Sequence, residues 1–241
     1  MDLDKLVKEI RVFFKKNADE SIVKKYSRYF KEGYKGYGVE HNIFIAKKDE
    51  WFTLYKDKFN LDYFLDLGGL LFSSGMFEEG ALAIHFLIKQ KEKLNKDTFK
   101  IIGDWLENYV SNWGHTDFIC SELLPYFFDK NIVKLDDIKP WRFSQSQWKR
   151  RAVSVTFIKL MKKDKSPDKY LNLIDPMMMD KDMPVHQGLG WFLRETWKKY
   201  PEPVESFLLK WKDTAPRLIF QYATEKMTKA EKERFRRKKE F

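Results

Sequence analysis

The feature that most constrains the fold is a weak internal repeat with a period of roughly 36 residues. Four apolar segments carry it: EGALAIHFLIK from Glu79, HTDFICSELLP from His115, RAVSVTFIKLM from Arg151 and QGLGWFLRETW from Gln187. In register, one position holds Ala83, Ile119, Val155 and Trp191, and the next holds Ile84, Cys120, Thr156 and Phe192. A fifth segment, APRLIFQYATEKM, follows the last after about 30 residues. This period is typical of repeats built from two helices.

Helical periodicity dominates the rest of the chain, and prolines stand where the later segments begin. No stretch alternates polar and apolar residues between hairpin turns. The sequence therefore predicts an all-α fold, a HEAT-like α-solenoid of antiparallel helix pairs, with an irregular helical bundle as the alternative. We expect one domain over residues 1–241, with a basic C-terminal tail from about residue 225 that forms a frayed basic helix.

The composition narrows the class of partner. The net charge of +10 and the pI of about 9.3 favour a polyanionic partner, of which nucleic acid is the first candidate. No apolar run approaches the roughly 20 residues that a membrane helix needs, so no membrane association is expected. Cys120 is the lone cysteine, which excludes an intrachain disulfide and fits a cytoplasmic protein.

Trp113 and Asp117 are the pair of residues most indicative of chemistry. They stand four apart in a predicted helix and therefore project from one face. A carboxylate beside an aromatic ring suits a substrate that is flat and cationic, or cationic in its transition state. The plainer interpretation is one core aromatic residue and one solvated acid.

Other candidates stand on the neighbouring repeats. On the solenoid model their helices line one groove, and the candidates are Tyr29, Arg150, Arg151, Lys159, Trp191 and Arg194. Each has an ordinary structural alternative. Trp191 fits a core position, Arg194 and Glu195 fit a surface ion pair, and Arg150 with Arg151 fits a solvated helix end.

Four motifs carry a resemblance to a known family: SRYFKEGYKGYGV, NWGHTD, QWKRRAVSV and GLGWFLRETWKKYP. In this order and at these separations they resemble the AlkD-type DNA glycosylases, a DNA alkylation repair family of HEAT-like proteins. The resemblance extends over roughly Lys24 to Lys210. It implies excision of N3- and N7-alkylated purines from double-stranded DNA without metal or cofactor, and without swinging the base into a pocket. We expect a monomer.

The resemblance also implies a role for each matching residue. Asp117 matches the aspartate beside the deoxyribose of the lesion, and Trp113 and Trp191 match the two tryptophans that flank this nucleotide. Arg151 and Lys159 match positions that bind the DNA backbone. Tyr29 matches a tyrosine that faces the site. Arg150 and Arg194 are added as further DNA-binding candidates.

The residue types fit this chemistry. An alkylated purine is already a cationic leaving group, so the barrier resides in oxocarbenium character on the sugar, which a carboxylate stabilises. One departure from the family pattern is the absence of a proline and an arginine after Gly38, where Lys47 and Lys48 are the nearest substitutes. His115 and Cys120 are expected to be structural and inert.

Two other classes of function stay open on the sequence. The first is a non-catalytic HEAT-like protein that binds distorted or branched DNA. The second is a protein-binding scaffold, whose groove would be acidic or mixed. The retained Trp113 and Asp117 favour the enzyme.

Overall fold

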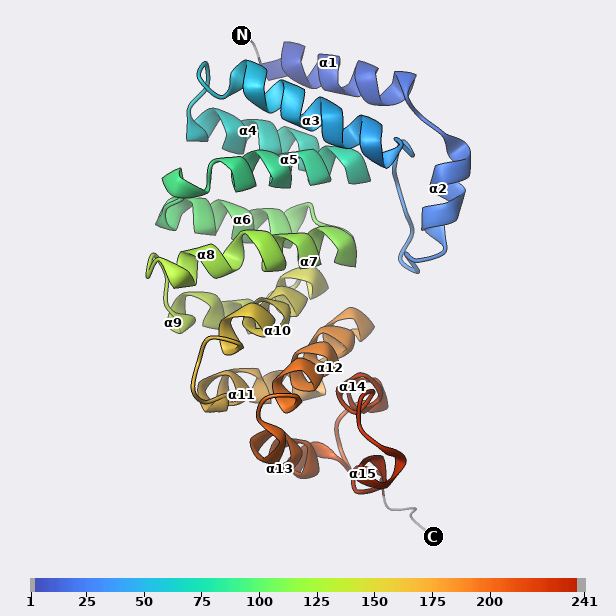
Figure 1. Ribbon diagram of the computed structural model, residues 1–241, viewed down its shortest axis with the longest axis vertical. Helices are drawn as coiled ribbons and strands as arrows, with labels where there is room; N and C mark the ends of the chain where they lie inside the picture. The colour runs from blue at the N-terminus through green and yellow to red at the C-terminus, as the bar shows by residue number, and fades with distance from the viewer. Residues whose placement is uncertain (1–2, 238–241) are drawn as a thin grey trace. The chain divides into compact units, whose positions relative to one another are not determined.

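The computed structural model describes residues 3–237, and within that range it consists of helices and turns without a strand (Figure 1). The prediction of an all-α fold is confirmed. The parts of the predicted domain and of the predicted basic tail at residues 1–2 and 238–241 lie outside the described residues. In chain order the elements are α1 (Leu3–Lys16), α2 (Glu20–Ser27), α3 (His41–Tyr55), α4 (Leu61–Phe72), α5 (Phe77–Lys89), η1 (Lys91–Lys93), α6 (Lys96–Asn108), α7 (Trp113–Glu122), α8 (Leu124–Asp129), α9 (Leu135–Ile138), η2 (Lys139–Phe143), α10 (Gln147–Met161), α11 (Asp168–Ile174), η3 (Asp175–Met179), α12 (Met183–Trp197), α13 (Pro201–Trp211), α14 (Arg217–Ala223) and α15 (Lys229–Glu233).

Helix starts follow from local chemistry. The side chains of Asn60, Asn95 and Asn112 cap α4, α6 and α7 by accepting backbone N–H groups that have no partner inside the helix. Prolines occupy the first turns of α12 and α13, where a missing N–H costs nothing. The proline punctuation seen in the sequence therefore marks real helix starts.

The chain divides into two compact units, Met1–Phe127 and Phe128–Phe241. The single-domain prediction stays a prediction beside this division. In the first unit, α4 packs against α1, α5 and α6, and α5 packs against α3 and α7. The short helix α2 has no buried residue and runs across the ends of the others (Figure 1). Its place brings the segment that follows it, residues 28–40, to the start of α7.

The second unit is built around α12, which packs between α10 and α14. Gly190 explains how closely α12 and α14 approach. A Cβ atom at this position would lie 2.4 Å from Cβ of Tyr222 and 2.7 Å from the carbonyl oxygen of Ile219. Helices α11 and α13 form the other side of this unit, in contact with α10 and α12 respectively.

The basic C-terminal segment is packed onto the second unit through residue 237. Met227 and Phe235 are buried, and a capping box formed by Thr228 and Glu231 starts α15. Arg217 and Arg237 donate to the carbonyl oxygens of Phe235 and Ala215. The expected frayed basic helix is thus replaced by an anchored one, because an aromatic residue on the segment has a core to enter.

The repeat read from the sequence matches helices. Its four segments lie in α5, α7, α10 and α12, and the fifth lies in α14. The register that holds Ile84, Cys120, Thr156 and Phe192 is buried throughout. In the other register Ala83, Ile119 and Val155 are buried, whereas Trp191 is only half-buried. Trp191 is therefore the position at which the last of the four segments departs from a pure core role.

No helix within residues 3–237 combines the length and the apolar character that crossing a bilayer requires.

Candidate functional site

Helix α7 begins at Trp113, and its first turn is fixed by the residue before it. The side chain of Asn112 accepts the N–H of His115 at 2.8 Å, and the Asn112 carbonyl accepts the hydroxyl of Thr116 at 2.9 Å. Trp113 and Asp117 then follow one turn apart on one face of the helix. Trp113 is exposed to 36 %, and Asp117 is half-buried.

Trp113 is held by the segment after α2. Its indole Nε1 donates to the carbonyl oxygen of Tyr29 at 3.1 Å. Its ring stacks on Phe30 with a centroid distance of 5.0 Å and an interplanar angle of 15°. One face of the indole is thus covered by protein and its polar atom is satisfied, so the exposed part of the ring has a defined orientation.

Tyr29 lies beside Trp113 and is 63 % exposed. The structure therefore places the backbone of Tyr29 against Trp113, one helical turn before Asp117 on α7. Among the predicted site residues, these belong to the first unit.

Glu78 anchors the segment that carries Tyr29. Its carboxylate accepts three successive backbone N–H groups, those of Tyr37 at 2.9 Å, Gly38 at 2.8 Å and Val39 at 3.2 Å. Gly38 has a φ of +75°, and a Cβ atom there would lie 2.1 Å from the carbonyl oxygen of Asp19. The glycine is therefore required by both conformation and space.

Glu79, the next residue, is fully buried and forms a second anchor. It accepts the hydroxyl of Tyr37 at 2.7 Å and pairs with Arg11 at 3.1 Å. Sequence reasoning missed both glutamates. The sequence does contain an indication of them, because two adjacent carboxylates stand at the start of an otherwise apolar helix. Acids buried with such a helix need hydrogen-bond or ion-pair partners.

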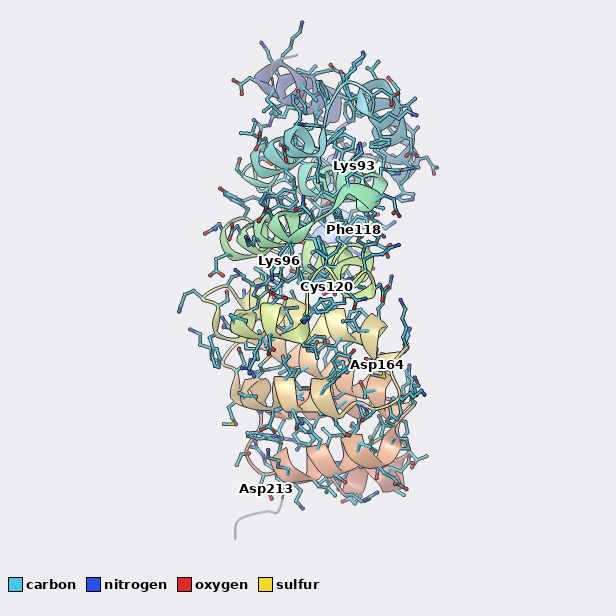
Figure 2. All side chains as sticks on the ribbon, turned by 90° about the vertical axis from the view of Figure 1, so that its left-hand side faces the viewer. Lys93, Lys96, Phe118, Cys120, Asp164 and Asp213 are labelled. Atoms are coloured by element: carbon cyan, nitrogen blue, oxygen red, sulfur yellow. The ribbon has the colours of Figure 1, made fainter. Side chains whose placement is uncertain are left out.

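His115 is structural, as expected. It is 4 % exposed, its Nε2 lies 2.8 Å from the carbonyl oxygen of Phe77, and its Nδ1 lies 3.1 Å from the amide nitrogen of Asn112. Burial lowers the pKa of His115 to about 4. The imidazole is therefore neutral at physiological pH and joins α7 to α5. Cys120 on the same helix (Figure 2) is fully buried.

In the second unit, Arg150 is committed to the fold. Its guanidinium pairs with Asp180 at 2.7 Å and with Asp182, and it donates to the carbonyl oxygens of Ser144 and Gln145 at 2.7 and 3.1 Å. Its exposure is 5 %. These contacts argue against the predicted DNA contact by Arg150, because a phosphate would have to displace two carboxylates.

Arg151 and Arg194 also have protein partners. Arg151 is buried and donates from Nη1 to the carbonyl oxygen of Pro184 at 2.6 Å. Arg194 pairs with Glu195 at 3.1 Å and with Glu225. The surface ion pair considered for Arg194 is present. Lys159 is exposed on α10, and Trp191 is half-buried on α12.

The two lysines considered as substitutes after Gly38 are engaged within the first unit. Lys47 pairs with Glu50 at 2.6 Å and lies 5.3 Å from the ring centroids of Phe13 and Trp51. Lys48 is 8 % exposed and pairs with Asp49 at 3.2 Å. Neither side chain stands free as a backbone contact.

The comparisons with known proteins agree with this architecture. A family model described as DNA alkylation repair enzyme matches residues 10–227. A solved structure described as a predicted DNA alkylation repair enzyme from Enterococcus faecalis superimposes with a TM-score of 0.75 at 14% identity, covering 88% of this chain and 98% of that one. AlkD2 from Streptococcus mutans superimposes with a TM-score of 0.60 at 22% identity, covering 87% and 99%. At these identities the two structures show the fold alone. No curated protein matches the chain.

Proposed function

Because the chain belongs to the DNA alkylation repair enzyme family, we propose that it is a monofunctional DNA glycosylase acting on duplex DNA. Its substrates are purines made cationic by alkylation at N3 or N7. The observation that supports this most is the pairing on α7 of an oriented, partly exposed indole and a half-buried carboxylate.

In the proposed reaction the bond between C1′ and the purine nitrogen breaks, and its electron pair neutralises the cationic base. Positive charge moves to the sugar, where the carboxylate of Asp117 stabilises it. Water then forms a bond to C1′ and loses a proton to solvent, with Asp117 orienting the water. The products are a neutral alkylpurine, an abasic site and a proton. The leaving group is already charged, so no second carboxylate is needed as a general acid.

Trp113 is proposed to hold the lesion nucleotide through the part of its ring that Phe30 leaves uncovered. A cationic base over an indole gains about 1–2 kcal/mol when desolvated. Tyr29 and Lys159 are proposed as further DNA contacts. In the second unit, Trp191 and Arg151 are proposed to contact the DNA. Arg194 is proposed as a further DNA contact, for which it must first break an ion pair. We propose a HEAT-like, monomeric, cytoplasmic protein that uses neither metal nor cofactor.

The test is base release from methylated duplex DNA, followed by chromatography of free 3-methyladenine and 7-methylguanine. Wild-type protein is expected to release at least one of them. Asp117→Asn is expected to slow release by about 100-fold or more, the usual loss when a transition-state charge is left unstabilised. DNA affinity should change little, because the substitution is nearly isosteric.

Asp97→Asn, at an exposed acid on α6 paired with Lys100, is the matched control and should release base at the wild-type rate. Wild-type protein that binds the DNA but releases no base would contradict the proposal. That outcome would favour the non-catalytic alternative, a protein binding distorted or branched DNA.

A further inference from the structure

Helix α2, which runs across the ends of the other helices of the first unit (Figure 1), begins a strongly basic stretch of chain. Residues 24–35 contain one exposed acid, Glu32, and five exposed cations. The five are Lys24, Lys25, Arg28, Lys31 and Lys35. Within residues 3–237, none of these five side chains pairs with a carboxylate. A bound polyanion would relieve the repulsion between them.

The cations of α2 project from one side of the helix and its apolar residues from the other. Lys24 stands four residues before Arg28, which keeps helical backbone angles of φ −65° and ψ −22°, so these two side chains share a face. On the opposite side, Val23 packs so closely that a Cβ atom at Gly38 would lie 2.9 Å from its Cγ2. The apolar side therefore faces the protein and the charged side faces solvent.

Both ends of this basic stretch are fixed to the first unit. Before it, Asp19 caps α2 by accepting the N–H of Ser21 at 2.7 Å, and its own N–H donates to the carbonyl oxygen of Tyr37 at 3.0 Å. Near its other end, Phe30 is buried and stacks on Trp113. Because the backbone is already ordered, a ligand of these cations restricts only their side chains, which lowers the entropic cost of binding.

The charged side adjoins the candidate site. Arg28 and Lys31 flank Tyr29 and Phe30 in the chain, and these two residues contact Trp113 through a carbonyl oxygen and a ring. The eight residues of α2 span roughly 12 Å, the length of roughly three to four nucleotides of one DNA strand. A strand that places one nucleotide at Trp113 can therefore place several of its neighbouring phosphates along α2.

The arginines singled out in the sequence are less available than these cations. Arg150 pairs with two carboxylates, Arg151 donates to a backbone carbonyl, and Arg194 forms ion pairs. A phosphate reaching Arg150 or Arg194 must first break an ion pair, which offsets the gain from the new contact. A phosphate reaching the α2 cations breaks none.

We propose that the exposed cations of residues 24–35 form a binding surface for the sugar–phosphate backbone of duplex DNA. The surface holds the strand beside Trp113 whatever its base sequence, because phosphate contacts carry no sequence information. The choice of duplex DNA as partner rests on the proposed function, whereas the charge, the exposure and the fixed backbone come from the structure. The main backbone contacts of the first unit thus lie on α2 and the turn after it.

Fluorescence anisotropy with an unmodified duplex tests this surface. The α2 variant combines Lys24→Gln, Arg28→Gln and Lys31→Gln and removes three charges from exposed positions. It should weaken duplex binding by at least about tenfold at roughly 100 mM salt. It should also make the log–log salt slope shallower by about two to three, because each lost phosphate contact lowers the slope by about 0.9.

The matched control removes the same charge at the other ends of the helices. It combines Lys56→Gln, Lys58→Gln and Lys93→Gln, three exposed lysines that follow α3 and α5 and pair with no carboxylate in the described chain. Helix α3 begins directly after the segment of residues 28–40, and α5 begins where Phe77 donates to the carbonyl oxygen of Lys35. The control positions thus lie a helix length away, and affinity should fall by less than about threefold.

Removal of the one acid on the surface gives a change in the opposite direction. Glu32→Gln should tighten duplex binding by about two- to threefold, because it removes repulsion of the phosphates. Asp57→Asn, at an exposed acid in the turn after α3, is its control and should bind like wild type. A gain in affinity cannot result from misfolding.

Equal salt slopes in the α2 variant and its control would overturn the proposal, provided that circular dichroism shows both folded. So would wild-type duplex affinity in the α2 variant together with lost binding to phosphatidylserine vesicles, which would assign the surface to a membrane. Binding of unmodified duplex requires no catalysis, so a failure of base release leaves this result unaffected. Equal slopes beside normal base release would remove this proposal alone.

Discussion

Trp113 shows how a single residue can be exposed and rigid together. Its nitrogen is bonded to Tyr29 and its ring is stacked on Phe30, yet it is 36 % exposed. The side chain of Trp113 has therefore already lost its rotamer entropy on folding. A ligand that stacks on the ring binds without a further entropic penalty for ordering this side chain. The spacing of Trp113 and Asp117 was readable from the sequence. The covering by Phe30 was not, because 83 residues separate the two rings.

His115 should make stability depend on pH. Its pKa is about 4 in the folded protein, against an ordinary value near 6.5, so the unfolded chain binds more protons between these values. The contribution is complete above about pH 6.5 and is lost as the pH falls toward 4. Between about pH 7 and 5 the free energy of unfolding should fall by roughly 2 kcal/mol from this group. Urea unfolding at both pH values measures the fall.

Two histidine variants test whether His115 causes this pH dependence. His115→Gln should lower stability at both pH values but reduce the difference between them by roughly 2 kcal/mol. His41→Gln, at an exposed histidine of α3, should keep the wild-type difference. An unchanged difference in His115→Gln would show that His115 binds protons equally in the folded and unfolded states, so that burial does not lower its pKa.

At the scale of elements, the end of the segment from residue 28 to 40 is held in place by a carboxylate. Glu78 accepts three backbone N–H groups in a row, at Tyr37, Gly38 and Val39. Glu78→Gln leaves one acceptor oxygen and adds an amide donor that opposes the N–H groups. Hydrogen exchange of these amides should accelerate by about tenfold or more, equivalent to about 1.4 kcal/mol.

Glu40→Gln is the matched control for that measurement. Glu40 is exposed and bonds the N–H of Asn42 at the start of α3. Its substitution should leave exchange at residues 37–39 unchanged. Equal exchange rates in Glu78→Gln and wild type would mean that backbone packing alone holds the segment.

Helix α12 depends on a close approach that only glycine permits. At Gly190 an added Cβ would meet Cβ of Tyr222 at 2.4 Å and backbone at 2.7 Å, whereas at Gly69 in α4 the nearest atom would be 3.9 Å away. Gly190→Ala should therefore destabilise the protein by about 1–3 kcal/mol. Gly69→Ala should be neutral or stabilising by up to about 1 kcal/mol through helix propensity. Thermal unfolding compares the two, and equal midpoints would contradict the packing argument.

Repeat segments and helix starts were predictable because they depend on local pattern: apolar spacing, asparagine caps and prolines. The environment of Arg150 was not. Its partners Asp180 and Asp182 stand on the other side of α11 and η3, and nothing in the motif QWKRRAV indicates them. The glutamate anchors were hidden for the same reason, since Glu78 bonds a turn about 40 residues earlier. Pairing between distant segments is a property of the packed structure.

At the scale of the whole molecule, the net charge of +10 predicts how binding responds to salt. A protein that neutralises about four phosphates should lose about 100-fold in duplex affinity between roughly 50 and 200 mM salt, because counterions are released. Fluorescence anisotropy at several salt concentrations gives the log–log slope. A slope near zero would instead favour the protein-binding scaffold.

The same salt titration tests whether Lys159 contacts a DNA phosphate. Lys159→Gln on α10 should make the slope shallower by about one, as expected for the loss of one phosphate contact. Lys93→Gln is the control, because it removes the same charge at a position away from the α7 pair. Lys93 (Figure 2) lies in η1, after the C-terminal end of α5, whereas Trp113 lies at the N-terminal end of α7. Helices α5 and α7 run in the same direction, because the chain reverses once before α6 and once after it (Figure 1). The C-terminal end of α5 and the N-terminal end of α7 therefore lie on opposite sides of the first unit. Equal slopes in the two variants would show that the electrostatic contribution comes from the overall charge and that Lys159 makes no phosphate contact.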